Sequence, residues 1–296
     1  MTGGGLRRER VVMRVSSVLL AVVAVVSPAV AQQPAAPPVD TIAVVALHLS
    51  DGSDLTGRVV AADDTSLTLL TFAGARVTVP RRAIVSWRPQ PGRVTAHGFQ
   101  RSDPNTSRLF FAPTARTLPG GSGHFTDYYI VFPSAGFGIS DRVMVSGGVS
   151  IIPGSDQLMY FAAKVGVVRK PEAAVAVGAF WATVPAESEA SLGTVYAVTT
   201  LGSEDHAVTL MAGMPFVTND VASQPLFVIG GETRIGAGTK FMAEVWKLPE
   251  ADEVPALFGL RWFGNKLAVG FGLVFVFPNS IEGWPFIPWM DFSVNF

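Results

Sequence analysis

The C-terminal two thirds of the chain alternates, position by position, between bulky apolar residues and small or polar residues. From Leu267 to Phe277 every second residue is large and apolar, while Ala268, Gly270 and Gly272 lie between them. A period of two is typical of β-strands, in which successive side chains point to opposite faces. We find no helical periodicity between residues 107 and 296, so the pattern predicts an all-β region.

Turn-forming residues divide this region into about twelve strands of the length that crosses a hydrocarbon layer at a tilt. The predicted strands are 107–116, 125–139, 142–152, 157–169, 172–184, 189–202, 205–217, 225–236, 239–248, 255–263, 266–277 and 285–296. An even number of strands is typical of bacterial single-chain barrels. Prolines 113, 133 and 288 fall inside these strands and remove ladder hydrogen bonds, so we expect bulges or locally broken pairing there.

The face opposite the bulky residues is mostly Gly, Ala and Ser with a few charges, whereas the outer face of a soluble sandwich would be broadly polar. This predicts an antiparallel transmembrane β-barrel over residues 107–296, with the bulky face toward lipid. By parity, the charges expected to line the lumen are Arg108, Arg116, Lys164, Glu232, Arg234, Glu244, Arg261 and Asp291. They either pair with one another in a packed interior or line a narrow pore.

Aromatic residues near the strand ends fit the two interfacial girdles of a membrane barrel. The two sets are Trp181, Phe216, Phe277 and Trp284 at one interface, and Phe137, Trp262 and Phe296 at the other.

The last residues continue the alternation to the end of the sequence, through Met290, Phe292, Val294 and Phe296. This ending resembles the C-terminal signal that the bacterial barrel assembly machinery reads. The resemblance implies a lipid bilayer and that machinery as partners.

The N-terminal 31 residues have a basic start, a short apolar run and a small-x-small site at Ala29–Ala31, which predicts a cleaved secretory signal peptide. A Pro/Ala-rich linker follows at 32–40. The exported chain has no cysteine, so disulfides do not stabilise it. Charged residues are 15% of the chain against about 25% in average soluble proteins. A net charge of −1 gives no support for nucleic-acid binding.

Residues 41–88 form five short predicted strands, 42–49, 55–62, 65–72, 75–79 and 83–87, separated by turns at Asp51-Gly52, Asp63-Asp64 and Ala73-Gly74. The motifs DGS, LTGRV, DDTSLTL and PRRAI in this segment resemble those of small Sm-like or SH3-like barrels. The resemblance implies a small domain that binds a partner, here in the periplasm. A second linker is predicted at 89–106.

The block from Asp103 to Gly154 resembles the start of an uncharacterised bacterial outer-membrane β-barrel family. The resemblance implies location and fold and no chemistry. With the N-terminal domain in the periplasm, short turns near Ser140, Pro171, Glu204, Ala237 and Asn265 are expected on that side.

Candidate chemistry is sparse. The four histidines lack zinc-ligand spacing, and no metal or cofactor site is predicted. Ser122, His124 and Asp127 lie together at a predicted outer loop, but three such residues in a polar loop are common by chance, so we predict that the protein is not an enzyme. The predicted function is a porin-like narrow channel or transporter for small solutes in the outer membrane. The alternative is a non-conducting structural or assembly barrel whose periplasmic domain binds an envelope partner.

Overall fold

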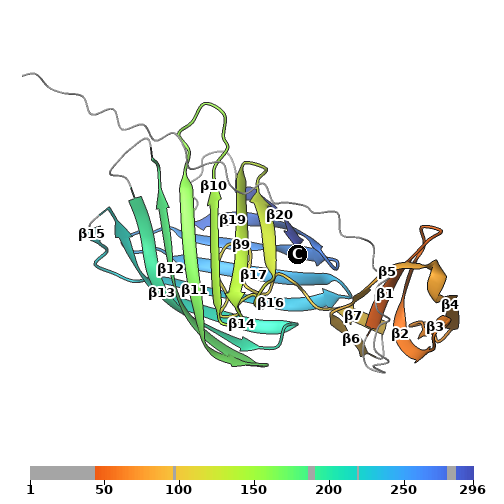
Figure 1. Cartoon of the computed structure of the whole chain (residues 1–296). Helices are drawn as coiled ribbons and strands as arrows, with labels where there is room; N and C mark the ends of the chain where they lie inside the picture. Colours follow the sequence, from red (N-terminus) through yellow and green to blue (C-terminus); the bar gives the residue numbers. More distant parts are fainter. Residues whose placement is uncertain (1–43, 96–97, 186–190, 219, 279–284) are drawn as a thin grey trace, which may run out of the picture. The chain divides into compact units, whose positions relative to one another are not determined.

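The computed structural model describes residues 44–95, 98–185, 191–218, 220–278 and 285–296 (Figure 1). The predicted signal peptide (1–31) and first linker (32–40), as well as Trp284, lie outside these residues. The described parts of the chain are β-strands, turns and loops with one short 3-10 turn, which confirms the all-β prediction. None of the helical segments described has the length and apolar character needed to cross a membrane.

A small sheet follows the predicted pattern of residues 41–88. Its strands are β1 (Val44–Leu49), β2 (Asp54–Ala62), β3 (Ser66–Leu70), β4 (Arg76–Pro80) and β5 (Ile84–Pro89), and they pair in the order β4-β3-β2-β1-β5. Leu47, Val59 and Leu69 are buried in its core. The Sm-like or SH3-like resemblance is not tested by this strand order and stays a prediction.

Turn chemistry explains the boundaries of these strands. Gly52 and Gly74 adopt positive φ angles of 84° and 83°, which glycine accommodates without steric cost. In the third turn, Asp63 accepts hydrogen bonds from the side chain and backbone of Thr65 and from Ser66, and these bonds hold the pKa of Asp63 well below its usual range. Part of the predicted linker 89–106 is a hairpin, β6 (Gly92–Thr95) and β7 (Gly98–Arg101).

The larger sheet closes on itself as an antiparallel barrel of twelve long strands among the described residues (Figure 1). Consecutive strands pair around the ring, β13 pairs with β14, and the last strand, β20, pairs with the first, β8. The short β15 (Asp220–Val221) pairs beside β14. The barrel strands are β8 (Gly123–Tyr128), β9 (Phe132–Ser140), β10 (Val143–Val149), β11 (Met159–Lys170), β12 (Ala173–Thr183), β13 (Ser191–Gly202), β14 (His206–Val217), β16 (Leu226–Gly236), β17 (Thr239–Lys247), β18 (Val254–Phe263), β19 (Leu267–Phe277) and β20 (Ile287–Asn295).

The predicted number of strands is right, but the first two predicted strands are wrong. Residues 107–116 are not a barrel strand, and the predicted strand 125–139 is two strands, β8 and β9, joined by a three-residue turn. Tyr129 and Ile130 have φ angles of 56° and 68°, and the Val131 N–H donates to the Tyr128 carbonyl at 3.2 Å. Paired positive φ angles are usually supplied by Asn, Asp or Gly, so the apolar sequence concealed this turn.

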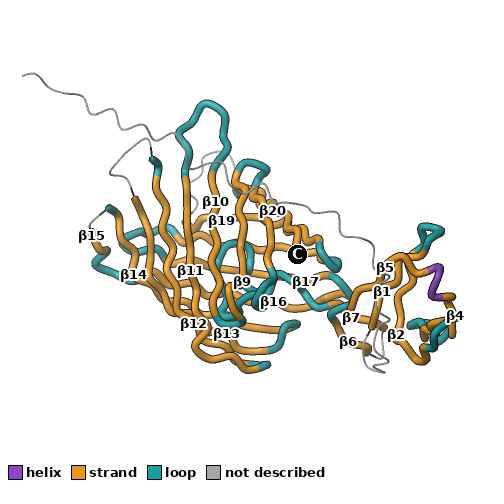
Figure 2. The backbone as a smooth tube through the Cα atoms, in the orientation of Figure 1, coloured by secondary structure: helices purple, strands orange, loops and turns teal. Residues whose placement is uncertain are grey.

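Successive connections between barrel strands lie alternately at the two ends of the barrel (Figure 2). Short turns follow β9, β11, β13, β16 and β18, at the five positions that the sequence predicts. We call this end the short-turn rim. The other end, the long-loop rim, includes the connections that follow β10, β14 and β17.

The two faces of the barrel differ as the alternation predicts. On the outer face, Phe271 is 49% exposed and Phe292 is 36% exposed. On the inner face, Lys164 is 4% exposed and Glu232 is 5% exposed. A soluble β-protein has the opposite arrangement, so the barrel presents its bulky apolar surface to its surroundings and encloses its charges.

Candidate functional site: the barrel lumen

We call residues 103–122 the inserted segment. Residues 103–118 run inside the barrel without forming a wall strand, and Gly121 and Ser122 exchange backbone hydrogen bonds with Gly138 of β9. The segment forms a tight hairpin in which the Leu109 N–H donates to the Ala112 carbonyl at 2.9 Å and the Thr114 N–H donates to the Ser107 carbonyl at 3.1 Å. Phe110 and Phe111 form its tip. At its end, Thr117 and Gly120 bind Asp141 at the short-turn rim, and β8 begins three residues later.

Small residues on the inner wall make room for this segment. A Cβ atom at Gly230 would collide with the side chain of Leu109, and one at Gly138 would collide with the carbonyl of Pro119. The glycine-rich inner face is therefore shaped to hold a second layer of chain.

Charged side chains of the wall hydrogen-bond to the backbone of the inserted segment. The Lys164 ammonium donates to the carbonyls of Ser107 and Thr114 at 2.9 and 2.8 Å. The Glu244 carboxylate accepts from the N–H groups of Phe111 and Ala112. Irregular backbone at membrane depth must be satisfied by protein, and these side chains satisfy it.

Arg261 supports the same backbone from β18, because its guanidinium donates to the carbonyls of Asn105 and Arg108 at 3.1 and 3.2 Å and to that of Leu109. On β13, the Thr200 hydroxyl accepts from the Ala115 N–H at 2.9 Å.

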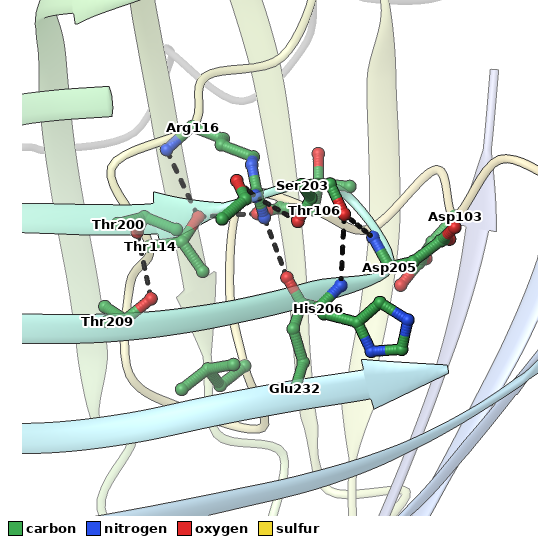
Figure 3. Close-up of polar contacts among 12 residues, drawn as sticks. Asp103, Thr106, Thr114, Arg116, Thr200, Ser203, Asp205, His206, Thr209 and Glu232 are labelled. Atoms are coloured by element: carbon green, nitrogen blue, oxygen red, sulfur yellow. Dashed lines mark hydrogen bonds and ion pairs between the residues drawn. The ribbon is translucent and has the colours of Figure 1, made fainter. Parts of the chain in front are cut away.

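Buried ion pairs link the segment to the wall near the short-turn rim (Figure 3). Glu232 contacts Arg116 at 2.7 Å and Lys240 at 2.8 Å. Lys240 also contacts Asp103 at 3.1 Å, and Asp103 lies 3.5 Å from Arg261. A separate pair joins Arg108 to Asp291 at 2.8 Å. Each charge of this network has an opposite charge beside it, which offsets the cost of burial.

The structure places the predicted lumen charges in three groups. Lys164, Glu232, Glu244, Arg261 and Asp291 are buried on the inner wall. Arg108 and Arg116 lie on the inserted segment, so their assignment to a first barrel strand was wrong, because residues 107–116 form an internal hairpin.

Arg234 alone forms the third group and lies near the end of β16, beside the short turn that follows this strand. It pairs with Asp205 and donates to the Ala237 carbonyl at 2.9 Å, instead of approaching Glu244. Two members of the ion-pair network were missed from the sequence. Lys240 shares the parity of Glu244 on β17 and could have been found, whereas Asp103 lies in the predicted linker and carries no such signal.

Apolar contacts fix the tip and flank of the inserted segment. Phe110 is fully buried with Met242 and Leu257. Leu109 packs in a second cluster with Val198 and Met211. The segment therefore packs from inside the barrel against β13 and β14 through Leu109 and against β17 and β18 through Phe110.

A cavity of about 330 Å³ remains between the inserted segment and the wall formed by strands β8–β14, β16 and β17. Its aromatic lining includes Phe111, Tyr160, Phe180, Tyr196 and Trp246. It extends toward the long-loop rim, where Leu248 and Pro249 line it, and ends in the lumen at His124, Arg108 and Lys164.

The predicted hydrolase-like residues do not converge. The Ser122 hydroxyl donates to the Pro119 carbonyl at 2.7 Å, whereas His124 faces the lumen cavity. Asp127 is three positions further along β8 and has the opposite parity, so it points to the other face of the wall. Among the described residues, no cluster of three or more His, Cys, Asp or Glu side chains could hold a metal ion.

The predicted assembly-signal residues lie at the end of the barrel sequence. Met290, Phe292 and Val294 occupy alternate positions of β20 and are exposed on the outer face. The backbone of Phe296 exchanges two hydrogen bonds with Gly123, at 2.8 and 2.9 Å. These two bonds join the end of the chain to the first barrel strand.

No family model matches the sequence, and no curated protein matches it. Among solved structures, the KdgM porin is 8% identical, with 59% of this chain and 95% of that chain covered and a TM-score of 0.41. A loop-deletion mutant of OmpT, an outer membrane protein of Vibrio cholerae, is 12% identical, with 86% and 97% covered and a TM-score of 0.34. Acinetobacter baumannii OccAB4 is 9% identical, with 83% and 66% covered and a TM-score of 0.32. At these identities and TM-scores the likenesses assign neither a family nor an activity.

Proposed function

We propose that this protein is an integral outer-membrane β-barrel that acts as a gated conduit for small solutes, with the inserted segment as its gate. The observation that carries the proposal is the closed ring of strands with an apolar outer face and a charged, occupied interior. Only closure satisfies every backbone group of a sheet that crosses lipid. Residues 44–101 then belong on the periplasmic side, where the predicted export signal would deliver the chain.

The contacts of the inserted segment support a gate more than an open pore. The segment packs against the inner wall through Phe110, and the cavity beside it extends toward the long-loop rim at Leu248 and Pro249. A solute entering from the long-loop rim would reach the floor at Lys164 and stop there. Passage therefore requires the ion pairs of Arg116 and Arg108 with the wall to open.

A disulfide lock tests the gate, and the absence of natural cysteines makes it specific. Ala115 and Thr200 touch through the 2.9 Å N–H···Oγ bond, so Ala115→Cys with Thr200→Cys joins the segment to β13. In planar bilayers, we expect the oxidised double variant to show no conductance steps and dithiothreitol to restore the infrequent openings of the unmodified protein.

Two controls accompany this experiment. Dithiothreitol should leave the cysteine-free protein unchanged, and a variant lacking residues 105–115 should conduct continuously. Heat-modifiable gel mobility shows whether the deletion variant is folded. If the folded deletion variant gives no conductance steps, the proposal that the protein is a conduit is contradicted.

Absence of conductance in the folded deletion variant would favour the alternative function, that of a non-conducting structural or assembly barrel. The specific observation behind the alternative is the density of contacts on the inserted segment, since Lys164, Glu244 and Arg261 all bind its backbone. In that case the domain of residues 41–88 would carry the function by binding a periplasmic partner.

A further inference from the structure

The floor of the lumen cavity is lined by basic side chains. Arg108, His124 and Lys164 line it, and none of its lining residues among those described is Asp or Glu. Lys164 has no carboxylate within ion-pair distance in the described part of the chain, and its two bonds to carbonyls leave a third N–H of the ammonium group.

Two further polar atoms at the floor lack partners. His124 is 6% exposed and its Nδ1 atom has no hydrogen-bond partner among the described residues. Arg108 is 7% exposed, and its Nε atom also has no hydrogen-bond partner among the described residues. Its terminal nitrogen Nη2 donates to Asp291 and Ser293. Buried polar groups are nearly always paired, and these two atoms, which have almost no accessible surface, are exceptions in side chains that line the cavity.

The upper walls of the cavity have a different character. Tyr160 and Phe180 stack with their ring centroids 5.6 Å apart, and Phe111 packs edge-on against Phe180 at 6.5 Å. Trp246 contacts Phe111 at 5.8 Å, while its own N–H donates to Glu244. Its volume of about 330 Å³ is at the lower end of the range of about 300–1,000 Å³ that is usual for small-molecule sites.

We propose that this cavity binds small amphipathic monocarboxylates. The carboxylate meets Lys164, His124 and Arg108 at the floor, and the apolar or aromatic body lies among Tyr160, Phe180 and Trp246. An anion at the floor supplies the negative charge that Lys164 lacks, and charge-assisted hydrogen bonds are the stronger kind. This inference rests on the proposed conduit and names the class of solute that it would admit.

Binding of 3-phenylpropionate to the full chain in lipid nanodiscs, measured by isothermal titration calorimetry, tests the proposal. The matched probes are 3-phenylpropanol and 3-phenylpropylammonium, which keep the body and change only the charge. We expect the carboxylate to bind at least tenfold more tightly than either. Equal affinity for the alcohol, or no binding of the carboxylate, overturns the proposal.

Matched variants locate the site. Ala162 faces the cavity one inward position from Lys164, so Ala162→Phe should abolish binding, whereas Ala179→Phe on the outer face of β12 should leave it unchanged. Lys164→Gln should weaken the binding of 3-phenylpropionate at least tenfold and leave the binding of 3-phenylpropanol unchanged. Lys170→Gln, at an exposed position of the same strand, is the control. If Lys164→Gln fails to fold, the binding of 3-phenylpropionate to Ala162→Phe still tests the location of the site. Binding that persists in Ala162→Phe overturns the proposal.

The inference and the proposed function fail in different ways. Calorimetry needs no conduction, so carboxylate binding in a barrel that stays silent after deletion of residues 105–115 contradicts the conduit alone. Conductance controlled by the disulfide lock, without carboxylate binding, contradicts the ligand class alone.

Discussion

At the scale of residues, Lys240 shows how the lumen accommodates its charges. Its ammonium is fully buried between Glu232 and Asp103, and each of these carboxylates has a second cation, Arg116 or Arg261. Removing one partner of a buried ion pair is strongly destabilising, because the other charge loses its compensation.

Lys240→Met should therefore lower the free energy of unfolding by about 3–5 kcal/mol, since it leaves two carboxylates sharing fewer cations. Urea titration of the protein in lipid vesicles gives this value. Lys247→Met, at an exposed position of the same strand, should change it by no more than about 0.5 kcal/mol.

A double-mutant cycle identifies the cause. Adding Asp103→Asn to Lys240→Met removes one of the two carboxylates that lose a cation, so the double variant should be more stable than the sum of the single effects predicts. Strict additivity would show that the contact between Lys240 and Asp103 contributes nothing.

At the scale of elements, β19 shows most clearly which face of the barrel is the apolar outer face. Phe271, Val269 and Leu267 are exposed on one side of the strand, whereas Ala268 and Gly270 face the lumen beside the closing strand. In water such a face would be a large exposed apolar surface, which soluble monomers rarely have.

Phe271→Arg, in the middle of β19, should cost about 2–4 kcal/mol of folding free energy in lipid, because a charge at the bilayer midplane is poorly solvated. Leu267→Arg, at the end of the same strand, should cost only about 0–1 kcal/mol. Equilibrium folding into vesicles measures both. Equal costs at the two positions would contradict a membrane-embedded outer face.

Strand ends also show how the prolines are accommodated. Pro133 and Pro288 are each the second residue of a strand, where a lost ladder bond does least harm. The register shifts lie elsewhere, after Val143, Gly166 and Arg234, so no bulge occurs at the prolines. The expected local break in pairing is present, because Pro133 pairs only with β8 and Pro288 pairs only with β19. Pro113 lies in the inserted segment.

At the scale of the whole molecule, the pairing of β20 with β8 closes the ring, and Phe296 extends this pairing by one residue. Phe296 and Gly123 exchange backbone hydrogen bonds, and a Cβ atom at Gly123 would collide with the Phe296 ring. The ring thus covers the glycine where the two ends of the sheet meet.

Phe296→Ala keeps these backbone bonds and removes only the ring. If the ring is the signal for barrel assembly, folded protein in the outer membrane should fall severalfold, while refolding of the purified variant into vesicles stays near that of the unmodified protein. Phe137→Ala, another exposed aromatic substitution near the same rim, is the control. An equal loss in both settings would assign the ring to stability instead of recognition.

The period-two pattern of the sequence was sufficient to predict the barrel, its outer face and the five short turns. These features are local, because the pleat of each strand and the turn chemistry at its ends are set by adjacent residues. The same parity identified the inward positions of Lys164, Glu232, Glu244, Arg261 and Asp291.

Only the tertiary structure decided what fills the lumen. Residues 107–116 alternate as a strand does, yet they form a hairpin inside the barrel, because wall side chains distant in sequence supply its hydrogen bonds and glycines such as Gly230 leave it space. The cavity floor, likewise, brings together Arg108, His124 and Lys164 from three separate segments. Contacts of this kind exist only after closure, so no local pattern could encode them.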